Sequence, residues 1–135
     1  MNNLECLVYI SRCTLNPEAL NAAFDDIVTV SAYRNADARI TGILAYQDGY
    51  FVQVLEGSPA ALDLLMIHLH FDPRHEDIRV IARSQIPAKN GISWSMISPP
   101  KNHPQQQALS TLLANEPASV EPWRNLLLEI VPQAA

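Results

Sequence analysis

A predicted hairpin strand constrains the fold more than any other part of the chain. Residues 50–57 read YFVQVLEG and follow an Asp-Gly pair at 48–49, which is a strong signal for a tight hairpin turn because glycine adopts positive φ at little cost. Side chains on a strand alternate between its two faces, so Phe51, Gln53 and Leu55 share one face. A buried amide without hydrogen bonds costs roughly 1–3 kcal/mol. The sequence therefore predicts a polar partner or a ligand against Gln53.

The composition is that of one ordinary folded domain, and it excludes several classes of function. The 135 residues, 48% of them hydrophobic, suit one domain with a single core. The net charge of −5 gives no electrostatic support for binding nucleic acid. No apolar run approaches the ~20 residues of a transmembrane helix, and the first residues do not resemble a signal peptide. We therefore expect a cytoplasmic protein that binds neither nucleic acid nor membranes.

The cysteine and histidine patterns do not predict a disulfide or a metal site. Cys6 and Cys13 fit neither a CxxC motif nor a disulfide framework, so we expect two free thiols that pack in the interior. Three histidines, His68, His70 and His75, lie close together in the sequence and invite a metal interpretation. His68 and His70 are two residues apart and diverge on a helix, so we expect no metal.

Strand and helix patterns alternate along the first 98 residues. Asn-Pro at 16–17 and Ser-Pro at 58–59 are typical helix starts, because Asn and Ser cap a helix and proline fits its first turn. The alternating patterns predict strands at 4–11, 40–46, 50–57, 78–84 and 92–98, and helices from 17 to about 33 and at 60–71. This order, β-α-β-β-α-β-β, is the ferredoxin-like α+β order plus one strand, with both helices on one sheet face.

The segment after Pro99-Pro100 is predicted to form two short helices. Their apolar sets recur at helical spacing and comprise Leu109, Leu112 and Leu113, then Trp123, Leu126, Leu127 and Ile130. Roughly 35 residues are too few for a separate core, so the segment should dock on the sheet face that the first two helices leave open, or on a partner. We divide the chain into a ligand-binding domain over 1–98 and a C-terminal helical cap or output segment over 99–135.

Several polar and aromatic residues are positioned to converge on one pocket. Tyr9 and Gln53 each lie in the middle of a predicted strand, on faces that can both look toward the helices. Asn35 follows the first predicted helix toward the same end, and Trp94 and Met96 lie two residues apart on the last predicted strand. The sequence thus predicts a pocket between the sheet and the helices, with Tyr9 and Gln53 at its floor.

This combination resembles the BLUF family of blue-light receptors, which bind a flavin. The matching segments are LVYIS at 7–11, RNADARITGIL at 34–44, DGYFVQVLEG at 48–57, DPRH at 72–75 and WSM at 94–96. The resemblance covers about residues 4 to 98, and its most specific part is FxQxLEG together with the upstream NxxxxITG. It implies that a flavin, FAD first and FMN as the alternative, lies between the two helices with its ring edge-on to the sheet.

The resemblance also implies roles for individual residues. Tyr9 corresponds to the tyrosine that gives an electron and a proton to the excited flavin, and Gln53 to the glutamine that bridges this phenol to the flavin. An amide has both donors and an acceptor, so it can change its hydrogen-bond pattern without a change of net charge. Trp94 or Met96 corresponds to the residue that reports the state of the glutamine to the last strand.

The remaining implied cofactor-binding residues come from both helices and from the turn after the second. Asn35 is expected at the flavin carbonyl, and Ser31 on the pocket-facing side of the first helix. Ile27 and Leu69 would sandwich the ring, while Arg34, Asp72, Arg74 and His75 would lie near its polar edge and the ribityl-phosphate side. Simpler interpretations stay open: Asn35 as a helix terminator, Arg74 and His75 as a solvated turn, and Trp94 as core packing.

These features together predict a photoreceptor that is not an enzyme. The chain has no room for a cyclase or phosphodiesterase domain, so its output should pass to a downstream signalling protein or through a homo-oligomer. The alternative is a flavin-dependent redox enzyme or electron carrier on the same fold, although the chain contains no GxGxxG motif. A third hypothesis is a ferredoxin-like interaction module that binds no flavin at all.

Overall fold

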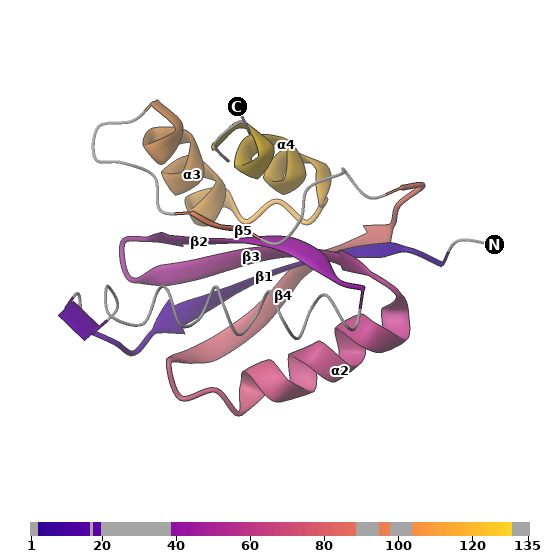
Figure 1. Cartoon of the computed structure of the whole chain (residues 1–135). Helices are drawn as coiled ribbons and strands as arrows, with labels where there is room; N and C mark the ends of the chain where they lie inside the picture. Colours follow the sequence, from indigo (N-terminus) through magenta and orange to yellow (C-terminus); the bar gives the residue numbers. More distant parts are fainter. Residues whose placement is uncertain (1–2, 17, 20–38, 89–94, 98–103, 131–135) are drawn as a thin grey trace.

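The computed structural model describes residues 3–16, 18–19, 39–88, 95–97 and 104–130, and in them a sheet carries helices on both faces (Figure 1). The strands are β1 (Glu5–Cys13), β2 (Thr41–Gln47), β3 (Tyr50–Gly57), β4 (His75–Gln85) and β5 (Ser95–Ile97). The helices are α2 (Pro59–His70), α3 (Pro104–Asn115) and α4 (Glu121–Ile130). The predicted helix from 17 to about 33 lies outside the described residues except for 18–19, which are helical.

The sheet has the ferredoxin-like strand order with one added strand. Its order is β4-β1-β3-β2-β5. Antiparallel pairs join β1 to β3 and β4, and β2 to β3, whereas β5 pairs parallel to β2. The strand β1 is central because its apolar residues alternate on both faces, which suits a strand that is covered from both sides. The predicted α+β fold is confirmed.

The predicted hairpin is formed as its sequence indicates. Asp48 and Gly49 have φ values of 54° and 88°, and Gln47 pairs with Tyr50 across the turn. Positive φ at both central residues is the signature of the two-residue turn that matches the twist of paired strands. The tight turn fixes the register of β2 against β3, and β3 has the predicted bounds.

Both predicted helix caps are present. Asn16 Oδ1 accepts a hydrogen bond from the backbone N–H of Ala19 at 2.7 Å, and Ser58 Oγ accepts one from Ala61 at 3.2 Å. These bonds satisfy N–H groups that have no partner inside the first turn of a helix. The two Xaa-Pro pairs therefore mark helix starts, as predicted.

The predicted strand at 78–84 begins earlier than expected. Strand β4 starts at His75, because the turn that follows α2 leads directly into pairing with the end of β1. Cys13 pairs with His75 and Arg12 with Glu76. The period-two pattern does not show this extension, because charged residues occupy both faces of the segment. It places His75 in edge contact with the rings of Tyr9 and Phe51.

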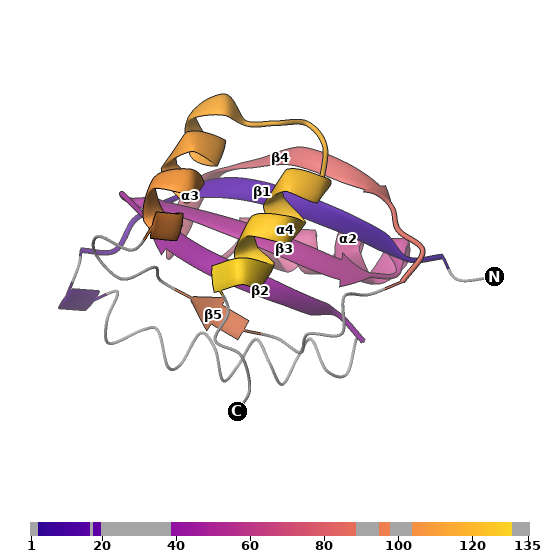
Figure 2. The same cartoon turned by 90° about the horizontal axis from the view of Figure 1, so that it is seen from above.

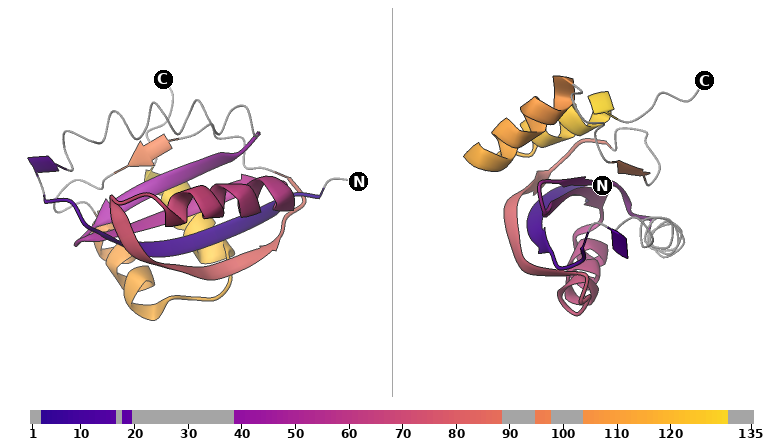
Figure 3. Two further views of the ribbon diagram at one scale, coloured as in Figure 1. Left: turned by 90° about the horizontal axis from the view of Figure 1, so that it is seen from below. Right: turned by 90° about the vertical axis from the view of Figure 1, so that its left-hand side faces the viewer.

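The sheet separates two apolar cores, and Figure 3 shows α2 on one side of it and α3 and α4 on the other. On one face α2 packs over a cluster of buried residues, namely Leu7, Tyr9, Ile40, Leu55, Leu62 and Met66. On the other face α3 and α4 lie across the strands (Figure 2), and their Leu109 and Trp123 join a cluster with Cys6, Val8, Ile10, Ile43, Val52 and Val54. The segment after residue 103 therefore covers the sheet face opposite α2.

The described part of β5 is shorter than the predicted strand at 92–98. It comprises Ser95–Ile97, and Ile92, Trp94 and Ser98 lie outside the described residues.

Cys6 is buried and Cys13 partly buried, and both are free thiols. Across the residues that the structure describes, none of the helices is long and apolar enough to cross a membrane.

Candidate functional site

A hydrogen bond between two buried side chains forms the centre of the site. Tyr9 on β1 and Gln53 on β3 are directly paired across the two central strands. Their residues are 2% and 3% exposed, and the Tyr9 hydroxyl donates to Gln53 Oε1. Both side chains lie on the α2 side of the sheet, as the period-two pattern predicts. This bond gives the Gln53 side-chain oxygen a hydrogen-bond donor, and so removes part of the free-energy cost of burying the amide.

Burial keeps the Tyr9 phenol protonated. Removal from water raises the pKa of Tyr9 far above its usual value, and the negative charge of Asp72 raises it further. Tyr9 is therefore a neutral donor at physiological pH. Among the described residues, no hydrogen bond uses Gln53 Nε2, so this group has two N–H donors available on the pocket side.

A pocket lies against the Tyr9–Gln53 pair. Its walls are the apolar side chains of Leu44, Phe51 and Leu69, and its remaining lining comes from Tyr9, Gln53, Asp72, Arg74 and His75. The lining thus combines apolar walls with a few polar groups, which is typical of sites for small organic ligands.

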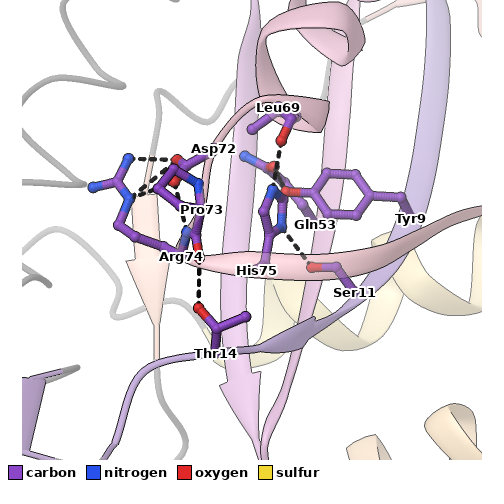
Figure 4. A network of polar contacts seen from close by, with 9 residues as sticks. All are labelled: Tyr9, Ser11, Thr14, Gln53, Leu69, Asp72, Pro73, Arg74 and His75. Atoms are coloured by element: carbon purple, nitrogen blue, oxygen red, sulfur yellow. Dashed lines mark hydrogen bonds and ion pairs between the residues drawn. The ribbon is translucent and has the colours of Figure 1, made fainter.

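His75 joins three elements around the pocket (Figure 4). Its Nε2 lies 2.8 Å from the carbonyl oxygen of Leu69 at the end of α2, and its Nδ1 lies 2.7 Å from Ser11 Oγ on β1. A carbonyl only accepts hydrogen bonds, so Nε2 carries a proton. In the neutral ring Nδ1 then accepts from the Ser11 hydroxyl. His75 therefore holds the end of α2, and with it Leu69, at a fixed place over the sheet.

The turn between α2 and β4 is held by further polar contacts. Arg74 Nε donates to Asp72 Oδ1 at 2.9 Å, and Arg74 Nη2 to Oδ2 at 2.6 Å. Although burial acts to raise the pKa of Asp72, the hydrogen bonds and charge of Arg74 hold that pKa below its usual range. Thr14 binds the Pro73 carbonyl at 2.6 Å through its hydroxyl. A fixed ion pair therefore lies at the polar rim of the pocket.

The raised pKa of Tyr9 predicts a pH dependence of stability. An unfolded tyrosine loses its proton near pH ~10, whereas folded Tyr9 keeps it to higher pH. Above that pH the folded state binds more protons than the unfolded state, so stability falls as pH rises. Urea unfolding from about pH 8 to pH 11 should therefore show a steeper alkaline loss for wild type than for Tyr9→Phe. Equal slopes would contradict a buried neutral phenol.

The structure brings six of the predicted site residues into one pocket, namely Tyr9, Gln53, Leu69, Asp72, Arg74 and His75. The backbone of Met96 lies in β5, where it pairs with Leu44. Five further predicted residues, Ile27, Ser31, Arg34, Asn35 and Trp94, lie outside the described residues. Across the described segments, no group of three or more His, Cys, Asp or Glu side chains could hold a metal ion.

Sequence reasoning missed several residues of the site. Phe51 and Leu44 line the pocket, and Ser11 and Thr14 hold the turn at 72–75 through side-chain bonds. Phe51 and Ser11 could have been found, because alternation places them on the same faces as Gln53 and Tyr9. Leu44 and Thr14 required the strand order and the path of the turn, which one sequence does not show.

The described residues fit a flat heteroaromatic group with a polar edge. Leu44 and Leu69 offer apolar surface for a ring, and Gln53 Nε2 offers N–H donors to acceptor atoms on its edge. The Asp72–Arg74 pair lies at the rim, where polar substituents would meet solvent. A flavin has this combination of a planar ring, carbonyl acceptors and a polar tail.

Comparison with known proteins agrees with this donor set. Residues 4–97 match the model of the BLUF family, described as sensors of blue light using FAD. The chain is 36% identical over 95 residues to the photoactivated adenylate cyclase subunit beta of Euglena gracilis. That match covers 70% of this chain and 11% of the relative, so the chain spans about a tenth of the curated relatives' length.

Solved structures show the same fold and the same family. The structure of BlrB, a BLUF protein in its dark state, is 29% identical with a TM-score of 0.81, and the match covers 97% of this chain and 99% of BlrB. A bacterial light-regulated adenylyl cyclase is 27% identical with a TM-score of 0.67, over 95% of this chain and 36% of the cyclase. The chain therefore belongs to the BLUF family, the flavin-binding sensors of blue light.

Proposed function

We propose that this BLUF protein senses blue light through the Tyr9–Gln53 hydrogen bond and passes the change to another protein or to a second copy of itself. The observation that carries this proposal is the buried bond between a neutral phenol and an amide at the floor of an apolar pocket. An amide in that place can present either its oxygen or its N–H groups, and each choice gives the pocket a different set of donors and acceptors.

A flavin bound in the pocket would supply the absorption of blue light and an acceptor for one electron from a nearby phenol. Tyr9 is the donor we propose, because it lies in the pocket and its proton already rests in a hydrogen bond to Gln53 Oε1. When the phenol gives up an electron its proton becomes strongly acidic and can pass to that oxygen. Return of the electron and of a proton to Tyr9 would then leave Gln53 rotated or tautomerised, with a changed hydrogen-bond pattern.

The other residues of the pocket would position the ring. Leu69 is held by the contact of its carbonyl with His75, so we propose it as one wall, with Ile27 and Ser31 on the other side. The Asp72–Arg74 pair is proposed for the polar rim with Arg34, and Asn35 for the carbonyl edge. We propose FAD as the flavin, and FMN as the alternative.

The strand order supplies a direct path from the switch toward the edge of the sheet. Gln53 pairs with Leu44 on β2, and Leu44 pairs with Met96 on β5. We propose that Met96 or Trp94 responds to the amide and that the segment 99–135 carries the signal outward from the domain 1–98. The output would be a partner or a homo-oligomer in the cytoplasm, without enzymatic activity in this chain.

The test is a pair of absorption spectra of the purified protein, recorded in the dark and after blue illumination. A BLUF photoreceptor should be yellow and should show a red shift of its flavin bands that reverses in the dark. Denaturation and chromatography of the released chromophore then distinguish FAD from FMN. A colourless protein, or steady oxidation of NADH without a reversible shift, would contradict the proposal.

A further inference from the structure

Helix α2 is apolar on its outer side as well as on its buried side. Leu62 and Met66 pack into the core beneath the sheet, yet Leu64, Ile67 and Phe71 on the outer side are 57%, 55% and 82% exposed. The outer side of a surface helix is normally polar, and a helix that is apolar all round is normally covered. Figure 3 shows α2 lying in front of the sheet when the molecule is viewed from this side.

The outer apolar residues form one continuous stripe. Ala60, Leu64, Ile67 and Phe71 follow each other at steps of four, three and four, which is the spacing of a helix–helix contact. Phe71 is the C-cap residue and keeps helical backbone angles, with φ −93° and ψ −1°, so it continues the line of the stripe. We call these four residues the α2 stripe.

We propose that the α2 stripe is a homodimer interface, in which α2 packs antiparallel against α2 of a second copy about a two-fold axis. In this arrangement the layers of an antiparallel pair place Leu64 against Ile67 of the second copy, and Ala60 against Phe71. Each layer occurs twice because the contact is symmetric. The smallest residue of the stripe thus faces the largest, which lets the two helices approach closely.

Charge on one flank of the stripe favours the same arrangement. Asp63 and His70 are seven residues apart and so lie on the same flank of α2. In an antiparallel pair equal flanks face each other, which brings Asp63 toward His70 of the second copy at two symmetric places. Arg83 binds Asp63 Oδ1 at 2.7 Å, but the Asp63 side chain remains 63% exposed. A ring N–H of His70 can therefore donate to this carboxylate across the interface.

This inference specifies the self-association that the proposed function allows, and it rests on α2 rather than on the flavin pocket. The stripe points away from the core to which Tyr9 belongs. Substitutions in it should therefore leave the light response intact, so the failure of one proposal is distinguishable from the failure of the other.

The first test compares two exposed apolar residues. Ile67→Glu places a carboxylate in the middle of the stripe, whereas Val80→Glu changes a residue on β4 that is 50% exposed and lies outside it. By analytical ultracentrifugation at tens of micromolar, we expect wild type and Val80→Glu to be dimers and Ile67→Glu to be a monomer with an unchanged light response. A monomeric wild type, or equal association of both variants, overturns the proposal.

The second test determines the orientation of the helices. In the antiparallel pair residue 60 faces residue 71, while two copies of residue 60 are separated by about 16 Å along the helix axis, beyond the roughly 7 Å that a disulfide can bridge. Mixed Ala60→Cys and Phe71→Cys proteins should therefore form a mixed disulfide dimer on oxidation, whereas Ala60→Cys alone should stay at the wild-type background. Efficient cross-linking of Ala60→Cys to itself would overturn the antiparallel arrangement.

Discussion

Arg124→Met should destabilise the protein by about 3–5 kcal/mol, because it removes the guanidinium that binds a buried carboxylate. Arg124 on α4 binds Glu56 on β3 at 2.9 Å, and the side chains of these residues are 13% and 2% exposed. Removal of the guanidinium would leave the buried Glu56 charge less well compensated beneath α4. Thermal unfolding followed by circular dichroism should show a melting temperature lower by roughly 10–20 °C.

Two matched variants separate this effect from the general loss of an ion pair. Arg12→Met removes an exposed pair with Glu76 and should cost no more than about 1 kcal/mol. The double variant Glu56→Gln/Arg124→Met removes the charge together with its partner and should regain most of the lost stability. A similar loss in Arg12→Met, or no recovery in the double variant, would show that the buried charge is not the cause.

The Glu56–Arg124 pair also ties the C-terminal helices to the strand that carries the switch. Glu56 lies three residues beyond Gln53 on β3, so the two side chains lie on opposite faces of the sheet. Gln53 meets the pocket on the α2 side, while Glu56 binds α4 on the other. A shift of the β3 backbone would therefore move both the Gln53 and the Glu56 side chains. This is consistent with 99–135 as an output segment.

Local patterns in the sequence were sufficient to predict most of the fold. The Asp-Gly turn fixes the β2–β3 hairpin by backbone geometry alone, and the period of two then assigns Gln53 and Tyr9 to the α2 face. Asn16 and Ser58 mark helix starts because their side chains satisfy backbone groups within three residues. Each of these predictions depends on interactions between neighbours in the chain.

The features that the sequence did not reveal depend on contacts between distant segments. Ser11 and His75 are 64 residues apart, and their bond follows from the unexpected early start of β4. Nothing local to Glu56 in the sequence indicates that it is buried in an ion pair, because its partner Arg124 comes from α4, 68 residues away. The exposed α2 stripe was likewise not apparent, because apolar residues on the second side of a helix do not show in the sequence whether another segment covers them.

Gln53→Leu should abolish the reversible red shift while the protein still binds flavin. Leucine has a similar size and keeps the pocket apolar, but it removes both the acceptor for the Tyr9 hydroxyl and the Nε2 donors. The Tyr9 donor would be left buried without a partner, at a cost of about 1–3 kcal/mol, which most folded domains tolerate. Difference spectra before and after blue illumination, normalised to the bound flavin, measure the effect.

Gln47→Leu is the matched control, because Gln47 is also a buried glutamine but lies on β2 and binds Ser110 of α3. It should lose stability by a similar amount and keep the full red shift, since its side chain is not among those that line the pocket. Loss of the shift in Gln53→Leu alone would assign the switch to the amide that Tyr9 contacts. A normal light cycle in Gln53→Leu would instead mean that light is sensed without this amide, and loss in both variants would point to damage of the fold.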